Sequence, residues 1–490
     1  MFLIDVICCV IGKDLIMEEQ TKSKIGLRMW MFLVLVGFVG QLAWSIENMY
    51  LNTYITYINF SAPLEERFDY SLYIALTTAF SAVVATLTTI FMGALTDKIG
   101  HKKYFISFGY LFWGISTASF GLFNVNSKNE MIPIAMVSSM AAIMVIIIDC
   151  VMTFFGSTAN DAAFNSYITK NIDEKNKGKV EGVLSILPLI AMLIIFVVLN
   201  GFTTDSKKGA NDARWDLFFY LIGAVVLIMG VVSFFLIPKE KEEKNDTTYL
   251  KLLVSGFKKD TIKKNSKLYL VLIIYFVYAV ACQVFFPYLM VYLEKTCEIA
   301  NTGSGFLTPF AMVMAIALIV GSSLSVVFGF LSDKYGKDRM IIPSFIVFGI
   351  GILLMFFIPM VSSSDSVSRT VYAAVAGLVM ILGYVGVPTV INALVRQYIP
   401  KGEEGIFMGV RMLFVVALPM CIGPFIGDAF NRSYGSQIPS ATFDGVYDTV
   451  PSSYGYLMGL AILVLSIIPI YFYLRKVKSE KHASNQETVR

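Results

Sequence analysis

Long apolar blocks alternate with short polar segments along almost the whole chain. Each block reaches the roughly 20 residues that a helix needs to cross a bilayer. The twelve blocks cover residues 29–58, 70–95, 104–124, 132–157, 182–201, 215–237, 268–293, 305–331, 340–361, 370–395, 405–430 and 454–474. Because a backbone in lipid must satisfy its own hydrogen bonds, each block is predicted to be a helix. The pattern therefore predicts an all-α membrane protein with twelve transmembrane helices.

The composition favours the same class and excludes others. Of the 490 residues, 56% are hydrophobic and 15% are charged, whereas about a quarter of a soluble domain is charged. Lys and Arg lie almost wholly between the apolar blocks, which excludes a nucleic acid as partner. The chain contains no P-loop, zinc-protease or serine-hydrolase motif, and its six cysteines show no metal-ligand spacing. We expect no enzyme, no cofactor and no metal site, and the partners to be a lipid bilayer and a small-molecule substrate.

The distribution of Lys and Arg predicts how the chain crosses the cell membrane. If both termini are cytoplasmic, the cytoplasmic segments from Met17 onwards carry 30 of these residues and the outer segments carry eight, with Lys13 as the remaining one of 39, as the positive-inside rule requires. The predicted organisation has five parts. These are a cytoplasmic tail 1–28, a six-helix bundle 29–237, a cytoplasmic linker 238–267, a six-helix bundle 268–474 and a cytoplasmic tail 475–490. Within the first tail, Met17 is an alternative native start, because residues 1–16 lack the features of a signal peptide.

One polar segment occurs twice, after the second and the eighth predicted helix. The pattern Gly-x-x-x-Asp-Lys-x-Gly begins at Gly93 and again 236 residues later at Gly329. Duplicated six-helix halves with a site at their interface are typical of transporters. We expect the glycines to allow close approach of helix ends and the basic side chains to reach the lipid headgroups. The two copies predict a cytoplasmic gate made of Gly93, Asp97, Lys98, Gly100, Lys102, Lys103, Gly329, Asp333, Lys334, Gly336 and Arg339.

The duplicated segment resembles the signature of the major facilitator superfamily, and the resemblance covers residues 17–478. It implies two pseudo-symmetric six-helix bundles, alternating access and a monomer. Two positions depart from the usual pattern: His101 stands where arginine is common, and Asp338 interrupts the second basic cluster. The second copy is therefore expected to contribute less to the gate than the first.

Two carboxylates lie deep within predicted helices, Glu47 in the first and Asp149 in the fourth. At 100° per residue, Asp149 falls on a polar stripe with Thr153 and Asn160. A buried carboxyl group without a cation favours its neutral form, so Asp149 and Glu47 are predicted to bind the coupling proton or cation. A helix-packing hydrogen bond is the alternative role for each. The eleventh helix also carries Arg411 near its inner end and Asp428 near its outer end, where neither needs to be buried.

Polar side chains on several helices predict the wall of a substrate cavity. In the second half, amide and aromatic groups suit the hydroxyls and the apolar faces of a sugar ring, with core packing as the alternative role for the aromatic ones. The candidate substrate-binding residues are Gln41, Asn48, Asn52, Thr153, Asn160, Gln283, Tyr384 and Asn392.

The stretches GQLAWSIENMYLNTYI and IIIDCVMTFFGSTANDAAFNSYITKNID resemble the first and fourth helices of sucrose-transporter-like proteins. These proteins group with the glycoside–pentoside–hexuronide:cation symporters, and the resemblance implies Asp149 as the coupling carboxylate. The second helix offers hydroxyl groups in place of the acids of melibiose permease, which favours H⁺ over Na⁺.

The sequence thus predicts a secondary active transporter that moves a sugar or glycoside with H⁺ or Na⁺. An exporter of amphiphilic compounds and a membrane sensor without transport are the alternatives. The identity of the substrate and the direction of transport are left open.

Overall fold

A computed structural model describes most of the chain. The described residues are 25–62, 64–123, 138–172, 174–203, 213–238, 257–299, 315–320, 323, 331, 334–361, 366–399, 404–439, 445 and 447–488. The proposed start at Met17 and most of the linker 238–267 lie outside them.

The first half of the described chain is helical. Its elements are α2 (Leu27–Ser45), η2 (Ile46–Tyr50), α3 (Leu51–Ser61), η3 (Leu64–Glu66), α4 (Tyr70–Ile99), α5 (Lys102–Ser119), η4 (Phe120–Phe123), α6 (Ser138–Gly156), η5 (Ser157–Phe164), α7 (Asn165–Asn171), α8 (Glu174–Ile194), η6 (Ile195–Leu199), η7 (Asn200–Phe202) and α9 (Trp215–Leu236).

The second half is helical except for one two-stranded sheet. Its elements are α11 (Lys259–Lys264), α12 (Ser266–Phe285), η8 (Phe286–Tyr288), α13 (Leu289–Val291), η9 (Tyr292–Thr296), α15 (Lys337–Phe357), η10 (Ile358–Met360), α16 (Ser366–Tyr398), α17 (Glu404–Met412), η11 (Leu413–Ala417), α18 (Leu418–Tyr434), β1 (Ser436–Pro439), β2 (Tyr447–Val450), α19 (Tyr454–Leu465) and α20 (Ile467–Thr488).

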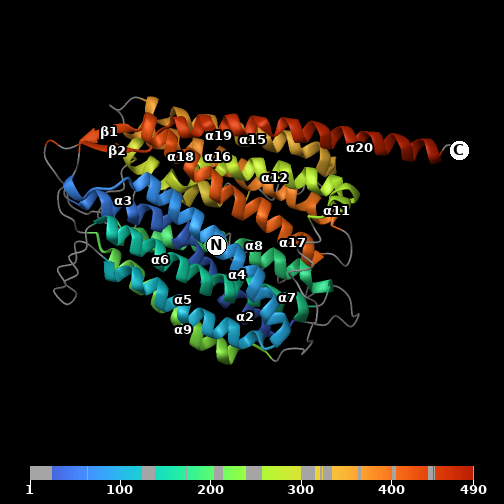
Figure 1. Ribbon diagram of the computed structural model, residues 1–490, viewed down its shortest axis with the longest axis horizontal. Coiled ribbons are helices and arrows are strands. Elements are labelled where there is room, and N and C mark those ends of the chain that lie inside the picture. Colours follow the sequence, from blue (N-terminus) through green and yellow to red (C-terminus); the bar gives the residue numbers. More distant parts are fainter. Residues whose placement is uncertain are drawn as a thin grey trace.

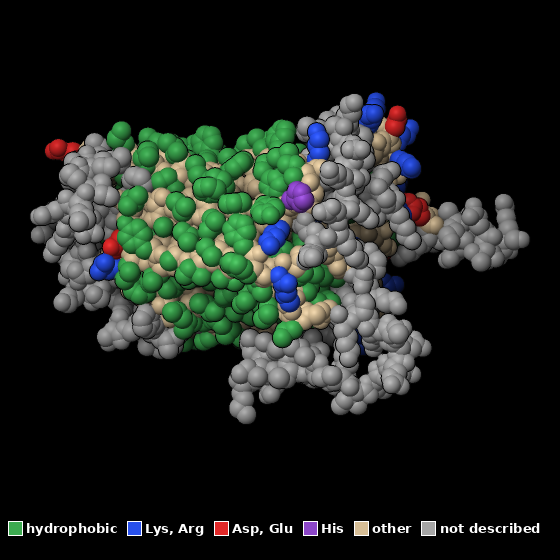
Figure 2. Space-filling model, turned by 90° about the horizontal axis from the view of Figure 1, so that it is seen from below, with side chains coloured by type: hydrophobic (Ala, Val, Ile, Leu, Met, Phe, Trp, Pro, Cys, Tyr) green, Lys and Arg blue, Asp and Glu red, His purple; other side chains and the backbone are tan. Residues whose placement is uncertain are grey.

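The predicted spans match this architecture. Ten helical segments within the described residues are long and apolar enough to cross a membrane, and the shorter apolar helix Ile186–Leu199 coincides with the predicted fifth span. Most of the predicted eighth span, 305–331, lies outside the described residues. Figure 2 shows a broad belt of hydrophobic side chains across one face, with charged groups towards its two ends. The chain is a multi-pass integral membrane protein.

The two halves lie one above the other in Figure 1, with α2 to α9 below and α12 to α20 above. We call the end that carries β1 and β2 the hairpin end. The opposite end carries α11, and α20 projects beyond the other helices there. Lys98, Lys334 and Arg339 are exposed near it, so we call it the basic end.

Small residues allow close helix packing within the first half. Helices α5 and α9 pack along their lengths, and a Cβ on Gly114 would lie 2.4 Å from the backbone nitrogen of Leu227. Without a hydrophobic force between helices in lipid, such close backbone contact is a main source of association. Alanine at Gly114 would therefore push α5 and α9 apart.

The duplicated motif has the same backbone feature in both copies. Gly100 has φ 80° and ends α4, and its N–H donates to the carbonyl of Thr96 at 2.9 Å. Gly336 has φ 93° directly before α15. Only glycine adopts this left-handed region without a steric cost, which explains the second glycine of each copy.

Other gate residues differ from expectation or lie outside the described part. A Cβ on Gly93 would meet nothing within 4 Å, so the expected close approach is absent there. Lys102 is buried rather than extended to the headgroups, because its position opens α5 inside the helix packing, whereas Lys103 is half-buried. The side chain of Asp97, and Gly329 and Asp333 entirely, lie outside the described residues.

Candidate functional site

A cavity lies between the two halves. It holds about 340 Å³ of space not filled by protein atoms, part of which is open to solvent. The first half contributes seven hydrogen-bonding or acidic groups, and the second half contributes one amide beside apolar groups. The lining residues are Glu47, Asn48, Asn52, Thr77, Thr78, Ser81, Asp149, Gln283, Phe286, Pro287 and Met420.

All seven lining side chains from the first half are polar.

A carboxyl–hydroxyl cluster forms the wall of the cavity in the first half. Glu47 lies in the π-helical segment η2, and Asp149 lies in α6 and is fully buried. Ser81 of α4 donates a hydrogen bond to Oε1 of Glu47, and its Oγ lies 3.0 Å from Oγ1 of Thr153. A serine hydroxyl has one proton, so Thr153 donates to Ser81. The hydroxyls of two helices thus support the Glu47 carboxyl group.

Asp149 has no such support. Neither of its carboxyl oxygens has a hydrogen-bond partner, and Oε2 of Glu47 also lacks one. Within the described ranges, no Lys, Arg or His pairs with either acid. No group of three or more His, Cys, Asp or Glu side chains that could hold a metal ion occurs in that part of the chain. The available oxygens can accept a proton or contribute to binding of a monovalent cation, and they leave donors and acceptors open to a solute.

The wall in the second half is amide and aromatic. Gln283 lines the cavity where α18 crosses α12, and a Cβ on Gly423 would lie 2.4 Å from Cβ of Gln283. The ring of Phe286 stacks on that of Tyr384, with centroids 5.3 Å apart and planes 6° from parallel. Tyr384 therefore lies one layer behind the cavity surface, and Tyr278 donates to its carbonyl oxygen at 2.7 Å.

Several predicted residues lie nearer the basic end. Asn160 lies beside Gly40, where a Cβ would come 3.1 Å from its Oδ1. Nδ2 of Asn392 donates to the hydroxyl of Tyr275 at 3.5 Å. Gln41 lies in α2, one and a half turns before Glu47 along the chain, and is half-buried. None of Gln41, Asn160 and Asn392 is among the residues that line the cavity.

Two charged residues of the eleventh span, which did not need to be buried, lie at least partly inside the protein. Asp428 is only 4% exposed, because Oδ2 accepts a 2.5 Å hydrogen bond from Arg432 within a packed interface. Arg411 is half-buried and its Nε is buried without a hydrogen-bond partner. Both side chains are drawn into the protein by packing against other helices, which a count of residues from the end of a span does not reveal.

The structure adds cavity residues that the sequence analysis did not select. Thr77, Thr78 and Ser81 share one face of α4, since positions three and four apart are neighbours on a helix. That spacing was a usable signal. Phe286, Pro287 and Met420 carry no polar pattern, and nothing in the sequence distinguishes them from packing residues.

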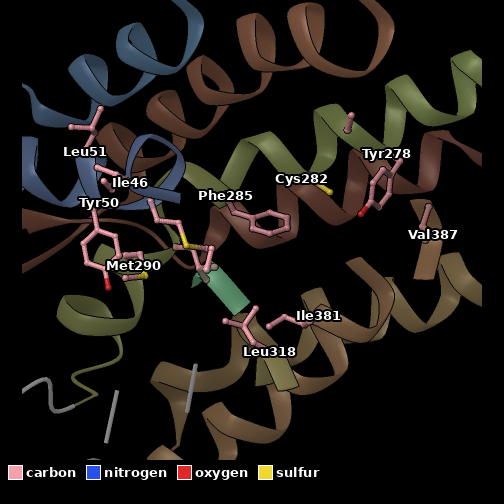
Figure 3. Packing of buried hydrophobic residues seen from close by; sticks show 14 of the residues in the cluster. Ile46, Tyr50, Leu51, Tyr278, Cys282, Phe285, Met290, Leu318, Ile381 and Val387 are labelled. Carbon is pink, nitrogen blue, oxygen red and sulfur yellow. The ribbon is translucent and has the colours of Figure 1, made fainter. Parts of the chain in front are cut away.

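The cavity is closed at the hairpin end by contacts between the halves, which we call the hairpin latch. Figure 3 shows Leu51 and Met290 among the buried side chains there, and their elements α3 and α13 are in contact. Strand β2 pairs with β1 in antiparallel register, and Asp448 on β2 forms an ion pair with Arg67. The latch also includes the hydrogen bonds or ion pairs Tyr70–Thr449, Asn431–Ser71, Tyr288–Ser71 and Arg432–Asp69.

A polar cavity at the interface of two helical halves, closed at one end, is the arrangement typical of membrane transporters. The comparison with known families agrees. The family model described as "Major Facilitator Superfamily" matches residues 33–424 and 308–489. The chain belongs to this superfamily, whose members are transporters and not enzymes. No curated protein sequence matches the chain.

Solved structures share the fold at low sequence identity. A D-xylose–proton symporter aligns with a TM-score of 0.65 and 12% identity, over 91% of this chain and 98% of that one. The nucleoside transporter NupG gives 0.61 and 13%, over 93% and 100%. A bacterial metal transporter gives 0.56 and 13%, over 92% and 99%. At such identity the likeness establishes the fold, and the three different cargoes leave the substrate of this chain open.

Proposed function

We propose that this chain is a secondary active symporter that carries a sugar or glycoside together with H⁺. The observation that supports it best is a pair of intramembrane acids, the half-buried Glu47 and the fully buried Asp149, in a polar cavity between the halves. An ionisable group within a membrane is costly unless it serves an ion or substrate pathway. The amide of Gln283 and the ring of Phe286 suit the hydroxyls and the apolar face of a sugar.

The two acids have different roles in this proposal. Asp149 has no donor on either oxygen, and an ionised carboxylate in that position would be unsatisfied. Binding a proton removes this cost, so Asp149 is the coupling group. Glu47 already accepts from Ser81, so it is the acid whose free oxygen accepts a substrate hydroxyl. Na⁺ with hydroxyl ligands from Thr77, Thr78 and Ser81 is the alternative coupling ion.

The orientation also belongs to this proposal. The basic end faces the cytoplasm and the hairpin end faces the outside of the cell, as the positive-inside rule predicts. The described conformation, with the hairpin latch formed, is then closed towards the outside. A polar lining on seven positions of the first half favours a hydrophilic solute over an amphiphilic one.

The test is uptake into proteoliposomes of labelled mono- and disaccharides, at two pH values and with or without sodium. Asp149→Asn imitates the protonated acid, so we expect it to retain exchange but to lose accumulation driven by a pH gradient. Glu47→Gln should raise the substrate concentration needed for half-maximal uptake. Asp260→Asn, the same substitution on the exposed helix α11, is the control. Full gradient-driven accumulation by Asp149→Asn would refute the coupling role.

A further inference from the structure

An unpaired cation lies near the basic end of the second half. Arg411 is at the end of α17, and its Nε is buried without a hydrogen-bond partner. Its guanidinium lies beside the hydroxyl of Tyr275, which also receives the amide of Asn392 at 3.5 Å. Among the described residues, no acidic side chain forms an ion pair with Arg411. A half-buried cation without an anion keeps part of the cost of desolvation, so a partner in another state would relieve that cost.

An unpaired acid lies on the facing half. Asp161 is half-buried in the π-helical segment η5, and no Lys or Arg of the described part forms an ion pair with it. Asp161 follows Asp149 by twelve residues. In an ideal α-helix this separation would place its side chain about 120° around the helix from that of Asp149. A π turn holds more residues, so each residue rotates the chain less and Asp161 returns towards the face of Asp149. Such π segments often occur at functional sites.

The two charges lie at similar depth. Asn160, the neighbour of Asp161, contacts Gly40 of α2. Gly40 is seven residues before Glu47, which is about 10 Å along an α-helix. On the other half, Arg411 lies beside Tyr275 of α12, which is eight residues before Gln283, or about 12 Å along the helix. Glu47 and Gln283 both line the cavity. Both charges are therefore one layer closer to the basic end than the cavity, on opposite halves.

We propose that Asp161 and Arg411 form an ion pair across the pathway when the basic end closes. In the described conformation the halves are joined at the hairpin end, and Asp161 and Arg411 form no ion pair with each other. Closure at the other end brings opposite charges of similar depth together, and their attraction offsets the cost of leaving each half-buried and unpaired. The pair would stabilise the state open to the hairpin end, where the latch is broken. This inference rests on the alternating access of the proposed function.

Cross-linking tests the pair without any substrate. In the double variant Asp161→Cys with Arg411→Cys, we expect an oxidant to form a disulfide in native membranes, identified by mass spectrometry of the linked peptides. The matched control is Asp149→Cys with Arg411→Cys, whose positions differ in depth by a layer and should not link. Equal yields in the two double variants, or no link in either, would overturn the pairing.

Charge exchange gives the second test. Asp161→Arg alone places two cations at the closure, so uptake should fall at least about tenfold. The double variant Asp161→Arg with Arg411→Asp restores the opposite charges and should recover most of that loss. An exchanged variant no better than Asp161→Arg, together with absent cross-linking, would mean that Arg411 binds another group, such as an anion of the solute. A link that forms in a chain without sugar uptake would retain the pair and refute the proposed substrate.

Discussion

The hairpin latch gives a prediction whose size follows from the structure. Arg67 and Asp448 form its ion pair, and their side chains are 11% and 5% exposed. Arg67 belongs to the first half and Asp448 to the second, so the pair exists only while the hairpin end is closed. The substitution Asp448→Asn keeps the size of the side chain and removes its charge. It should therefore shift the equilibrium towards the state open at this end.

The magnitude depends on what Arg67 retains. Removing one partner of a buried ion pair costs about 3–5 kcal/mol. Arg67 also donates to the carbonyl oxygens of Ala62 and Phe60, so its guanidinium keeps acceptors after the substitution. We therefore expect the closed state of the hairpin end to lose less than this range in free energy, about 2 kcal/mol. This changes the ratio of open to closed molecules by about 30-fold.

The native thiol of Cys421 provides the assay. Its Sγ lies 3.8 Å from the carbonyl oxygen of Ala79 on the other half, so opening of the hairpin end exposes it. A membrane-impermeant maleimide is added to intact cells, and labelling of the Cys421 peptide is followed by mass spectrometry. Asp448→Asn should label up to about 30 times faster than wild type. Tyr447→Phe, at an exposed position of the same strand, should label at the wild-type rate.

Two results would refute the reasoning. One is an unchanged labelling rate in Asp448→Asn with normal expression. The other concerns the exchanged variant Arg67→Asp with Asp448→Arg, which should restore slow labelling if the attraction between the charges holds the latch. Fast labelling in that variant would mean that the fit of the hairpin, and not the ion pair, closes this end.

The remaining predictions concern the duplicated motif and the topology. Gly100→Ala forces a Cβ into the left-handed region and should lower stability by about 1 kcal/mol, whereas Gly93→Ala, in open space on the same helix, should not; thermal unfolding in detergent compares them. Asp97→Asn should slow uptake at normal expression, because the carboxyl group stabilises closure at the basic end, and wild-type flux would contradict this. A cysteine label at Ser363 should react from outside, whereas one at Ser479 should react only after permeabilisation, and the reverse pattern would invert the proposed orientation.

The sequence predicts the helices well because each span follows from one local requirement. A backbone in lipid must satisfy its own hydrogen bonds, so composition alone indicates a helix. The predicted first span, 29–58, corresponds to the apolar segment Leu27–Ser61. The hairpin of β1 and β2 was not predicted, since its strands have four residues each. The hairpin also contacts residues that are far away in the sequence, such as Arg67. Such long-range contacts leave no local sequence pattern.

The candidate site was predicted in part for the same reason. Glu47 and Asp149 are rare acids in apolar blocks, and their position at one cavity follows from the cost of placing them elsewhere. Ser81 joins Glu47 to Thr153, but a serine in a membrane helix has no distinguishing pattern, because it can bond to its own backbone. Asp161 was missed because a wheel of constant 100° steps cannot include the π turn of η5.

The positions of the π segments connect these observations. Glu47 lies within η2, Asp161 lies within η5, and Arg411 comes two residues before η11. A π turn leaves backbone groups less regularly bonded than an α turn and changes which face a side chain occupies. Each of these π segments therefore lowers the stability of its helix. If the helix only had to pack, deletion of one residue would restore a regular α-helix and remove this cost. The presence of a π segment beside an intramembrane charge is explained if the charge must face the pathway between the halves. The charges near these turns are thus the first positions at which substitution should affect transport more than folding.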